Sequence, residues 1–129
     1  MSKLDDFLGL TDVSDIRKTI GVELEGKKFE ITVRPITEDE HTEFQRRSNN
    51  ISKNKVTFDS GKYNNLVLSS CVVEPNFSDE NFLRQVKCTS ATEFLNRKFP
   101  AGTLNEIARQ IQELSGFESY DLEIENAKN

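Results

Sequence analysis

Two runs of alternating residues near the start of the chain constrain its fold more than any other feature. Residues 20–25 and 28–33 each place an apolar side chain at every second position, which is the pattern of a strand with one buried face. Gly26-Lys27 lies between the runs and suits a two-residue type II′ turn. We therefore predict a β-hairpin whose register this turn sets. The predicted cross-strand pairs are Leu24 with Phe29, Val22 with Ile31, and Ile20 with Val33.

Three capping boxes mark helix starts after the hairpin. In each, a serine or threonine is followed three positions later by glutamate, and the two side chains bond to free backbone N–H groups. The first box begins at Thr37 and starts a helix that extends to about Ser48. The second begins at Ser90. The third begins at Thr103, and its helix ends at Gly116-Phe117, where the glycine supplies a left-handed cap.

Two further helices are predicted between the first and second capping boxes. Residues 63–73 have helical apolar spacing, which Pro75 ends. Ser78 can cap the next helix, and Phe77 can pack on Phe82 across its first turn as a hydrophobic staple. Because a two-stranded hairpin is only marginally stable alone, we expect these helices to cover its apolar face.

The predicted fold class is α+β. An N-terminal β-hairpin packs on several short helices that form most of the C-terminal part. Whether a third strand joins the hairpin is not decided by the sequence. We expect residues 1–117 to form a single domain and residues 118–129 to be a loosely ordered acidic tail. The side chains expected to be buried are Leu24, Phe29, Ile31, Val33, Leu66, Val67, Ile107, Ile111 and Leu114.

A short apolar stripe precedes the hairpin. Leu4, Phe7 and Leu8 have helical spacing, but two turns of helix are unstable alone in water. The stripe must therefore dock on another surface. We expect its own domain to supply that surface in preference to a partner.

A polar segment separates the first two predicted helices. We predict a long loop at residues 49–60, in which Val56 and Phe58 can add a short strand. Residues 44–62 carry five basic side chains and one acidic one. This charge could contact nucleic acid, but few aromatic stacking partners accompany it and tryptophan is absent. We interpret the segment as a solvated loop.

Composition excludes several classes of function. The chain has a net charge of −5 and a pI of about 5.0, which oppose nonspecific binding to nucleic acid or anionic membranes. A helix that spans a bilayer needs a run of about 18 apolar residues, and the sequence contains no such run. Residues 1–6 lack the basic start and apolar run of a secretion signal, so we expect the chain to stay inside the cell that makes it.

No catalytic constellation is evident. His41 lies one turn into a predicted helix, and no motif surrounds Cys71 or Cys88, so we expect a solvated histidine and structural cysteines. The glycines are scattered and form no phosphate-binding loop. We predict that the chain is not an enzyme and has no catalytic, cofactor-binding or metal-binding residues.

The chain resembles a known family between residues 16 and 117. A helix that ends in Val73-Glu74-Pro75 is followed at once by the helix start at Phe77-Ser78. The order of these segments is similar to that of the XkdN-like phage tail assembly chaperones, as are the hairpin and the Ile36-Thr37 turn. The segments that carry the resemblance are residues 66–79, 89–95, 99–102 and 107–117.

The resemblance implies a function and a partner. Members of the family bind the long tape measure protein, help tail tube subunits assemble around it, and are absent from the finished virion. They have no catalytic residues. The implied partners are the tape measure protein and the tail tube protein, in the cytoplasm of the bacterial host. The alternative is a head–tail connector or tail-terminator component that stays in the particle as a ring. The sequence assigns no partner-binding residues.

The family also implies that a longer form exists. Many tail assembly chaperones are extended by ribosomal frameshifting near the end of the first reading frame. Lys128-Asn129 can be encoded by an adenine-rich run on which a ribosome slips. The hypothesis is that a second reading frame overlaps this end. Codons there without a slippery run would exclude it.

Overall fold

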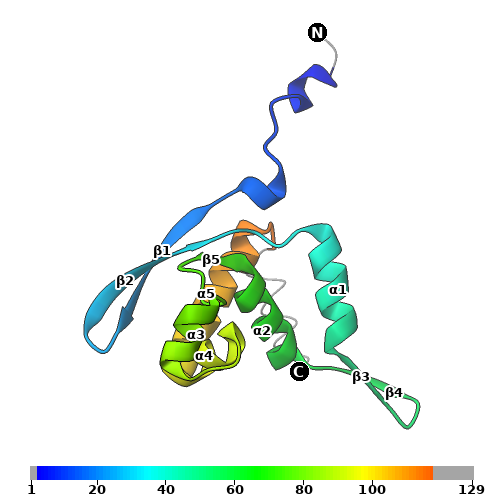
Figure 1. The fold of residues 1–129 in the computed structure, drawn as a ribbon. Coiled ribbons are helices and arrows are strands. Elements are labelled where there is room, and N and C mark those ends of the chain that lie inside the picture. Colours follow the sequence, from blue (N-terminus) through cyan, green and yellow to red (C-terminus); the bar gives the residue numbers. More distant parts are fainter. Residues whose placement is uncertain (1–2, 118–129) are drawn as a thin grey trace.

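The structure is a computed structural model that describes residues 3–117. The predicted acidic tail at residues 118–129 therefore lies outside the described residues. Figure 1 shows a small sheet against a group of helices, with two segments that extend from this body. The elements are η1 (Asp5–Phe7), η2 (Val13–Asp15), β1 (Lys18–Leu24), β2 (Lys27–Val33), α1 (Glu38–Ser48), β3 (Asn49–Ser52), β4 (Lys55–Phe58), α2 (Ser60–Cys71), β5 (Val72–Glu74), α3 (Glu80–Val86), α4 (Ala91–Lys98) and α5 (Ala101–Leu114).

Strands β1, β2 and β5 form an antiparallel sheet in the order β1-β2-β5. One face of the sheet carries Ile20, Val22, Ile31 and Val33, which are all buried. These four side chains join one apolar cluster with residues of α1, α2, α4 and α5. The predicted α+β class is confirmed, and β5 is the third strand that the sequence left open.

The register of the β1–β2 hairpin differs from the prediction. Ile20 faces Ile31, and the two turn residues are Glu25 and Gly26, both with positive φ (52° and 77°). Positive φ at both positions is the type I′ turn, whose twist matches that of the flanking strands. The shift also places Glu23 opposite Lys28, an attractive pair. The predicted turn at Gly26-Lys27 and its register are therefore wrong.

The helix starts at Thr37 and Ser90 are confirmed. Thr37 Oγ1 accepts a hydrogen bond from Glu40 N (3.2 Å), and the Glu40 carboxylate accepts one from Thr37 N (3.1 Å). Ser90 Oγ accepts from Glu93 N (3.1 Å). The second half of the capping box is altered at this helix. The Glu93 carboxylate accepts from Thr89 N (2.9 Å) and not from the Ser90 N–H.

The last helix starts earlier than predicted and ends where predicted. Pro100 is its N-cap, so Thr103 lies inside the first turn and caps nothing. Proline has a fixed φ and needs no hydrogen-bond partner for an N–H, which suits a helix start. At the other end Gly116 has a φ of 93°, and Phe117 N donates to Gln112 O (3.0 Å). This is the glycine-terminated cap that the sequence indicated.

The third helix has a different cap from the predicted one. Asp79, rather than Ser78, accepts from Phe82 N (3.0 Å). Carboxylates cap a helix as well as serine does, and they also favour the positive end of the helix dipole. The predicted packing of Phe77 on Phe82 is present, with ring centroids 5.9 Å apart.

Residues 63–73 do not form one continuous helix. Helix α2 ends at Cys71, and the chain continues directly as β5. Val72 pairs with Val33, and Arg34 N donates to Cys71 O (2.9 Å). The backbone groups at this helix end are therefore satisfied by β2 instead of by a further helical turn.

The predicted core is largely correct. Ile31, Val33, Val67, Ile107 and Ile111 are buried. Leu24, Leu66 and Leu114 are partly buried and pack against the core cluster. Phe29 is 47% exposed, because the tip of the β1–β2 hairpin extends past the helices (Figure 1). Its predicted burial is wrong.

Candidate partner-binding surfaces

The N-terminal segment, residues 4–16, is called the arm here, and its residues 4–15 are all exposed. Leu4, Phe7, Leu8 and Leu10 are 65–81% exposed. The helical structure of the arm is limited to the two three-residue turns η1 and η2, which are too short to be stable without a partner. Figure 1 shows that the arm extends away from the sheet and helices. The expectation that it docks on its own domain is therefore wrong.

The segment predicted as a long loop is a second hairpin. Strands β3 and β4 pair, and the turn residues Lys53 and Asn54 have φ of 48° and 66°. Asparagine tolerates this left-handed conformation, which completes a type I′ turn. The short strand predicted at Val56 and Phe58 is confirmed. In Figure 1 the β3–β4 hairpin extends beyond the end of α1.

The β3–β4 hairpin has one apolar face. Ile51 pairs with Val56, and Phe58, two residues further along β4, lies on the same face. These three side chains are 80%, 65% and 41% exposed. Phe58 also contacts the ring of Tyr63 on α2, with centroids 5.8 Å apart. The face is therefore held at its base and uncovered along its length.

Basic residues lie at both ends of this hairpin, in the last turn of α1 and at the hairpin tip. Residues 46–58 contain four of them and no acidic residue: Arg46, Arg47, Lys53 and Lys55. Arg46 is partly neutralised by Glu43, with Nη2 and Oε1 2.5 Å apart. The two lysines form no ion pair with the residues that the structure describes. The hairpin is thus an exposed surface that is apolar and positively charged.

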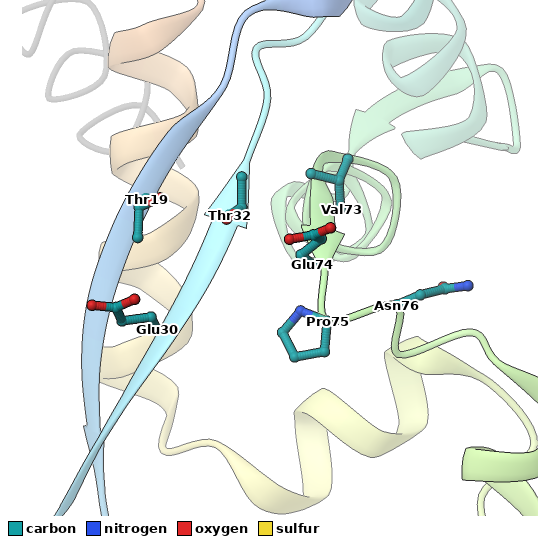
Figure 2. Close-up of a pocket in the computed structure, with 7 residues that line it drawn as sticks. All are labelled: Thr19, Glu30, Thr32, Val73, Glu74, Pro75 and Asn76. Carbon is teal, nitrogen blue, oxygen red and sulfur yellow. The ribbon is translucent and has the colours of Figure 1, made fainter.

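A third surface is a shallow hollow of about 510 Å³ on the outer side of the sheet. Figure 2 shows its lining, in which side chains of β1 and β2 face the segment from β5 onward. The hollow is open, its lining is only about half apolar, and its two ionisable groups are both carboxylates, so an apolar helix gains little there. The lining residues are Thr19, Glu30, Thr32, Val73, Glu74, Pro75 and Asn76.

His41 is not the solvated residue that the sequence predicted. It is half-buried, its Nδ1 lies 2.5 Å from Tyr63 Oη, and its ring centroid lies 5.1 Å from that of Phe117. The position became enclosed because α1 packs beside α2 and the end of α5. The hydrogen-bond partner of His41 Nδ1 is therefore a tyrosine hydroxyl and not a cysteine thiol.

Both cysteines are buried, as expected of structural cysteines. Burial raises the pKa of the Cys71 thiol to about 12, so this group is protonated at neutral pH and is a poor nucleophile. Cys71 Sγ lies 4.0 Å from the Pro35 carbonyl oxygen. The thiol of Cys88 contacts Arg97, with Sγ and Nη1 3.4 Å apart.

An ion pair that the sequence did not reveal joins the end of β2 to α1. Arg34 donates from Nη1 and Nη2 to the two carboxylate oxygens of Glu40, both at 2.7 Å. Their side chains are only 17% and 25% exposed. The hydrogen bonds from Arg34 lower the pKa of Glu40. This pair fixes the direction in which the chain enters α1.

Residues 3–117 contain neither a candidate metal centre nor a candidate membrane-spanning helix. No group of three or more histidine, cysteine, aspartate or glutamate side chains in this part of the chain could hold a metal ion. Within the same described part, every helix is too short or too polar to cross a membrane.

Comparisons with known proteins identify the family. The model of the phage XkdN-like tail assembly chaperone proteins matches residues 4–128. The crystal structure of the protein YqbN, a structural genomics target, has the same fold with a TM-score of 0.63. The sequences are 17% identical over 92% of this chain and 99% of that one. No curated protein matches. The chain belongs to the XkdN-like family of phage tail assembly chaperones.

Proposed function

We propose that this chaperone binds the tape measure protein in the cytoplasm of the bacterial host and assists tail tube assembly without catalysing a reaction. The observation that carries the proposal is the family match, which spans residues 4–128. The protonated, buried Cys71 and the tyrosine-bound His41 agree with a role that needs no nucleophile.

The exposed apolar side chains support this proposal. A tape measure protein is a long helical chain, and its apolar faces need a cover before the tail assembles. The arm and the β3–β4 hairpin offer apolar side chains that nothing in the described chain covers, such as Leu8 and Ile51. Uncovered apolar surface of this kind is typical of interaction sites. The net charge of −5 would help to keep the complex dispersed.

Co-expression tests the proposal. We expect the soluble yield of the tape measure protein to rise when this chain is present, and the complex to survive high salt, because apolar contacts are screened less than exposed ion pairs. The control is a triple variant, Leu8→Ser, Ile51→Ser and Val56→Ser, which keeps the net charge but loses exposed apolar surface. It should rescue less tape measure protein than the unmodified chain.

Two results would contradict the proposal. Equal rescue by the triple variant, with dissociation in moderate salt, would mean that charge alone makes the contact. Recovery of the chain from purified particles by mass spectrometry would favour the alternative, a connector or tail-terminator component retained as a ring. A ring subunit needs two complementary faces. The arm and the β3–β4 hairpin are two separate exposed surfaces that agree with this alternative.

A further inference from the structure

The arm and the β3–β4 hairpin have opposite charges. The arm, residues 4–16, contains four aspartates and no basic residue. Residues 46–58, which comprise the end of α1 and the hairpin, contain four basic residues and no acidic one. Each also exposes apolar side chains beside its charges. The two surfaces are therefore complementary in charge, and both gain from removing apolar area from water.

We propose that the arm of one copy of this chain docks on the apolar face of the β3–β4 hairpin of a second copy. Phe7 and Leu8 of the arm cover Ile51 and Val56 of the hairpin. The aspartates of the arm then lie near the basic residues at the tip and at the base of the hairpin, among them Lys53 in the turn.

Each surface is incomplete without such a contact. A single two-stranded hairpin is marginally stable in water, and β3–β4 has no third strand within the described residues. The arm contains two separate short turns of helix, η1 and η2, which are also marginal alone. Docking covers Ile51 and Phe7 together, and it orders both segments at one interface.

The placement of the two segments favours a second copy over the same chain. In Figure 1 the arm leaves the body beside the start of β1 and extends away from it. The β3–β4 hairpin lies beyond the far end of α1 and extends in another direction. An arm that extends away from its own hairpin is placed to reach that of a neighbour.

The contact has a consequence for assembly. It joins two different surfaces, so the first contact between two copies leaves one arm and one hairpin free. If these two also pair, a closed two-fold dimer results; if they bind further copies, rings or open arrays form. The inference concerns the purified chain alone and does not depend on the tape measure protein as partner.

Sedimentation equilibrium of the full chain tests the inference. We expect the mass to rise with concentration. We test an arm variant (Phe7→Ser with Leu8→Ser) and a hairpin variant (Ile51→Ser with Val56→Ser). Each should raise the dissociation constant about tenfold or more, since each removes two apolar side chains that the proposed contact buries. All four residues are 65–81% exposed in one chain, so folding should be unaffected. Phe29→Ser, at an exposed site on the other hairpin, is the control and should change nothing.

Mixing the two defective variants gives the decisive result. Each retains one intact surface, so an equimolar mixture should form a one-to-one dimer that cannot grow further. A monomeric unmodified chain at every concentration would overturn the inference and indicate that the arm folds back or binds another protein. Failure of the mixture to dimerise would overturn it also, because arm-to-arm or hairpin-to-hairpin contacts cannot be restored in this way.

Discussion

Replacement of Ile111 by alanine should lower the free energy of unfolding by about 2–5 kcal/mol. The side chain is fully buried and lies on α5. The cost has two parts, the lost transfer free energy of the removed carbons and the cavity that they leave. Val33 of β2 belongs to the same apolar cluster and is also fully buried. Urea denaturation followed by circular dichroism measures the change.

The matched control is Ile51→Ala, which removes the same atoms from an exposed site. Ile51 is 80% exposed on β3, so its loss should cost less than about 1 kcal/mol, the span of strand propensities. The measurement belongs at low protein concentration, where any self-association is absent. If Ile111→Ala also cost less than about 1 kcal/mol, α5 would not be packed as the structure describes.

The β1–β2 hairpin shows what an alternating pattern determines. The pattern determines which face of a strand each side chain occupies, and the assignment of Ile20, Ile31 and Val33 to the core face is correct. It does not determine the register, because a shift of two residues leaves every side chain on its original face. Only the turn separates the two registers, and both candidate turns include Gly26. The sequence could therefore predict the face but not the pairing.

The start of α5 shows the limit of a local capping signal. Thr103 and Glu106 have the spacing of a capping box, but the helix already begins at Ala101. Glu106 is instead paired with Arg109, with Oε1 and Nη2 2.5 Å apart. A partner one turn further along therefore binds the carboxylate that the pattern assigned to the cap. The choice depended on Pro100, whose backbone already suited a helix start.

The candidate surfaces were only partly visible in the sequence. The charges of the arm and of residues 46–58 can be counted from the sequence, and the strand at Val56 was predicted. Exposure cannot be read in the same way, because Ile51 and Ile111 are chemically identical yet are 80% and 0% exposed. What separates them is whether other elements pack over the side chain, which depends on contacts between distant segments.

The second large effect concerns Glu40, which we expect to be a main contributor to stability outside the apolar core. Glu40→Gln keeps the size of the side chain but replaces one of the two oxygens that accept hydrogen bonds from Arg34 with an NH₂ group, which cannot accept. Both side chains are mostly buried, so the lost bidentate pair is not replaced fully by water. We expect the free energy of unfolding to fall by about 1.5–3 kcal/mol at neutral pH, the range for hydrogen bonds to charged groups.

Glu43→Gln is the control on the same helix. Glu43 accepts from Arg46 Nε (3.0 Å) and Nη2 (2.5 Å), so this pair also has two hydrogen bonds, from a different pair of guanidinium nitrogens. Its side chains are 70% and 48% exposed, and exposed ion pairs contribute little. The control should therefore cost clearly less than Glu40→Gln. Equal losses would mean that burial does not strengthen the Arg34–Glu40 pair.

The effect of Glu40→Gln should also depend on pH in a defined direction. Hydrogen bonds from Arg34 lower the pKa of Glu40 from its ordinary value of 4.5. A carboxyl group with a lowered pKa stabilises the folded state fully above its unfolded pKa. That contribution is lost as the pH falls below 4.5 and through the lowered folded value. The difference between the unmodified chain and Glu40→Gln should therefore be constant near neutral pH and shrink in acid. A difference that grew in acid would contradict the assigned role of this pair.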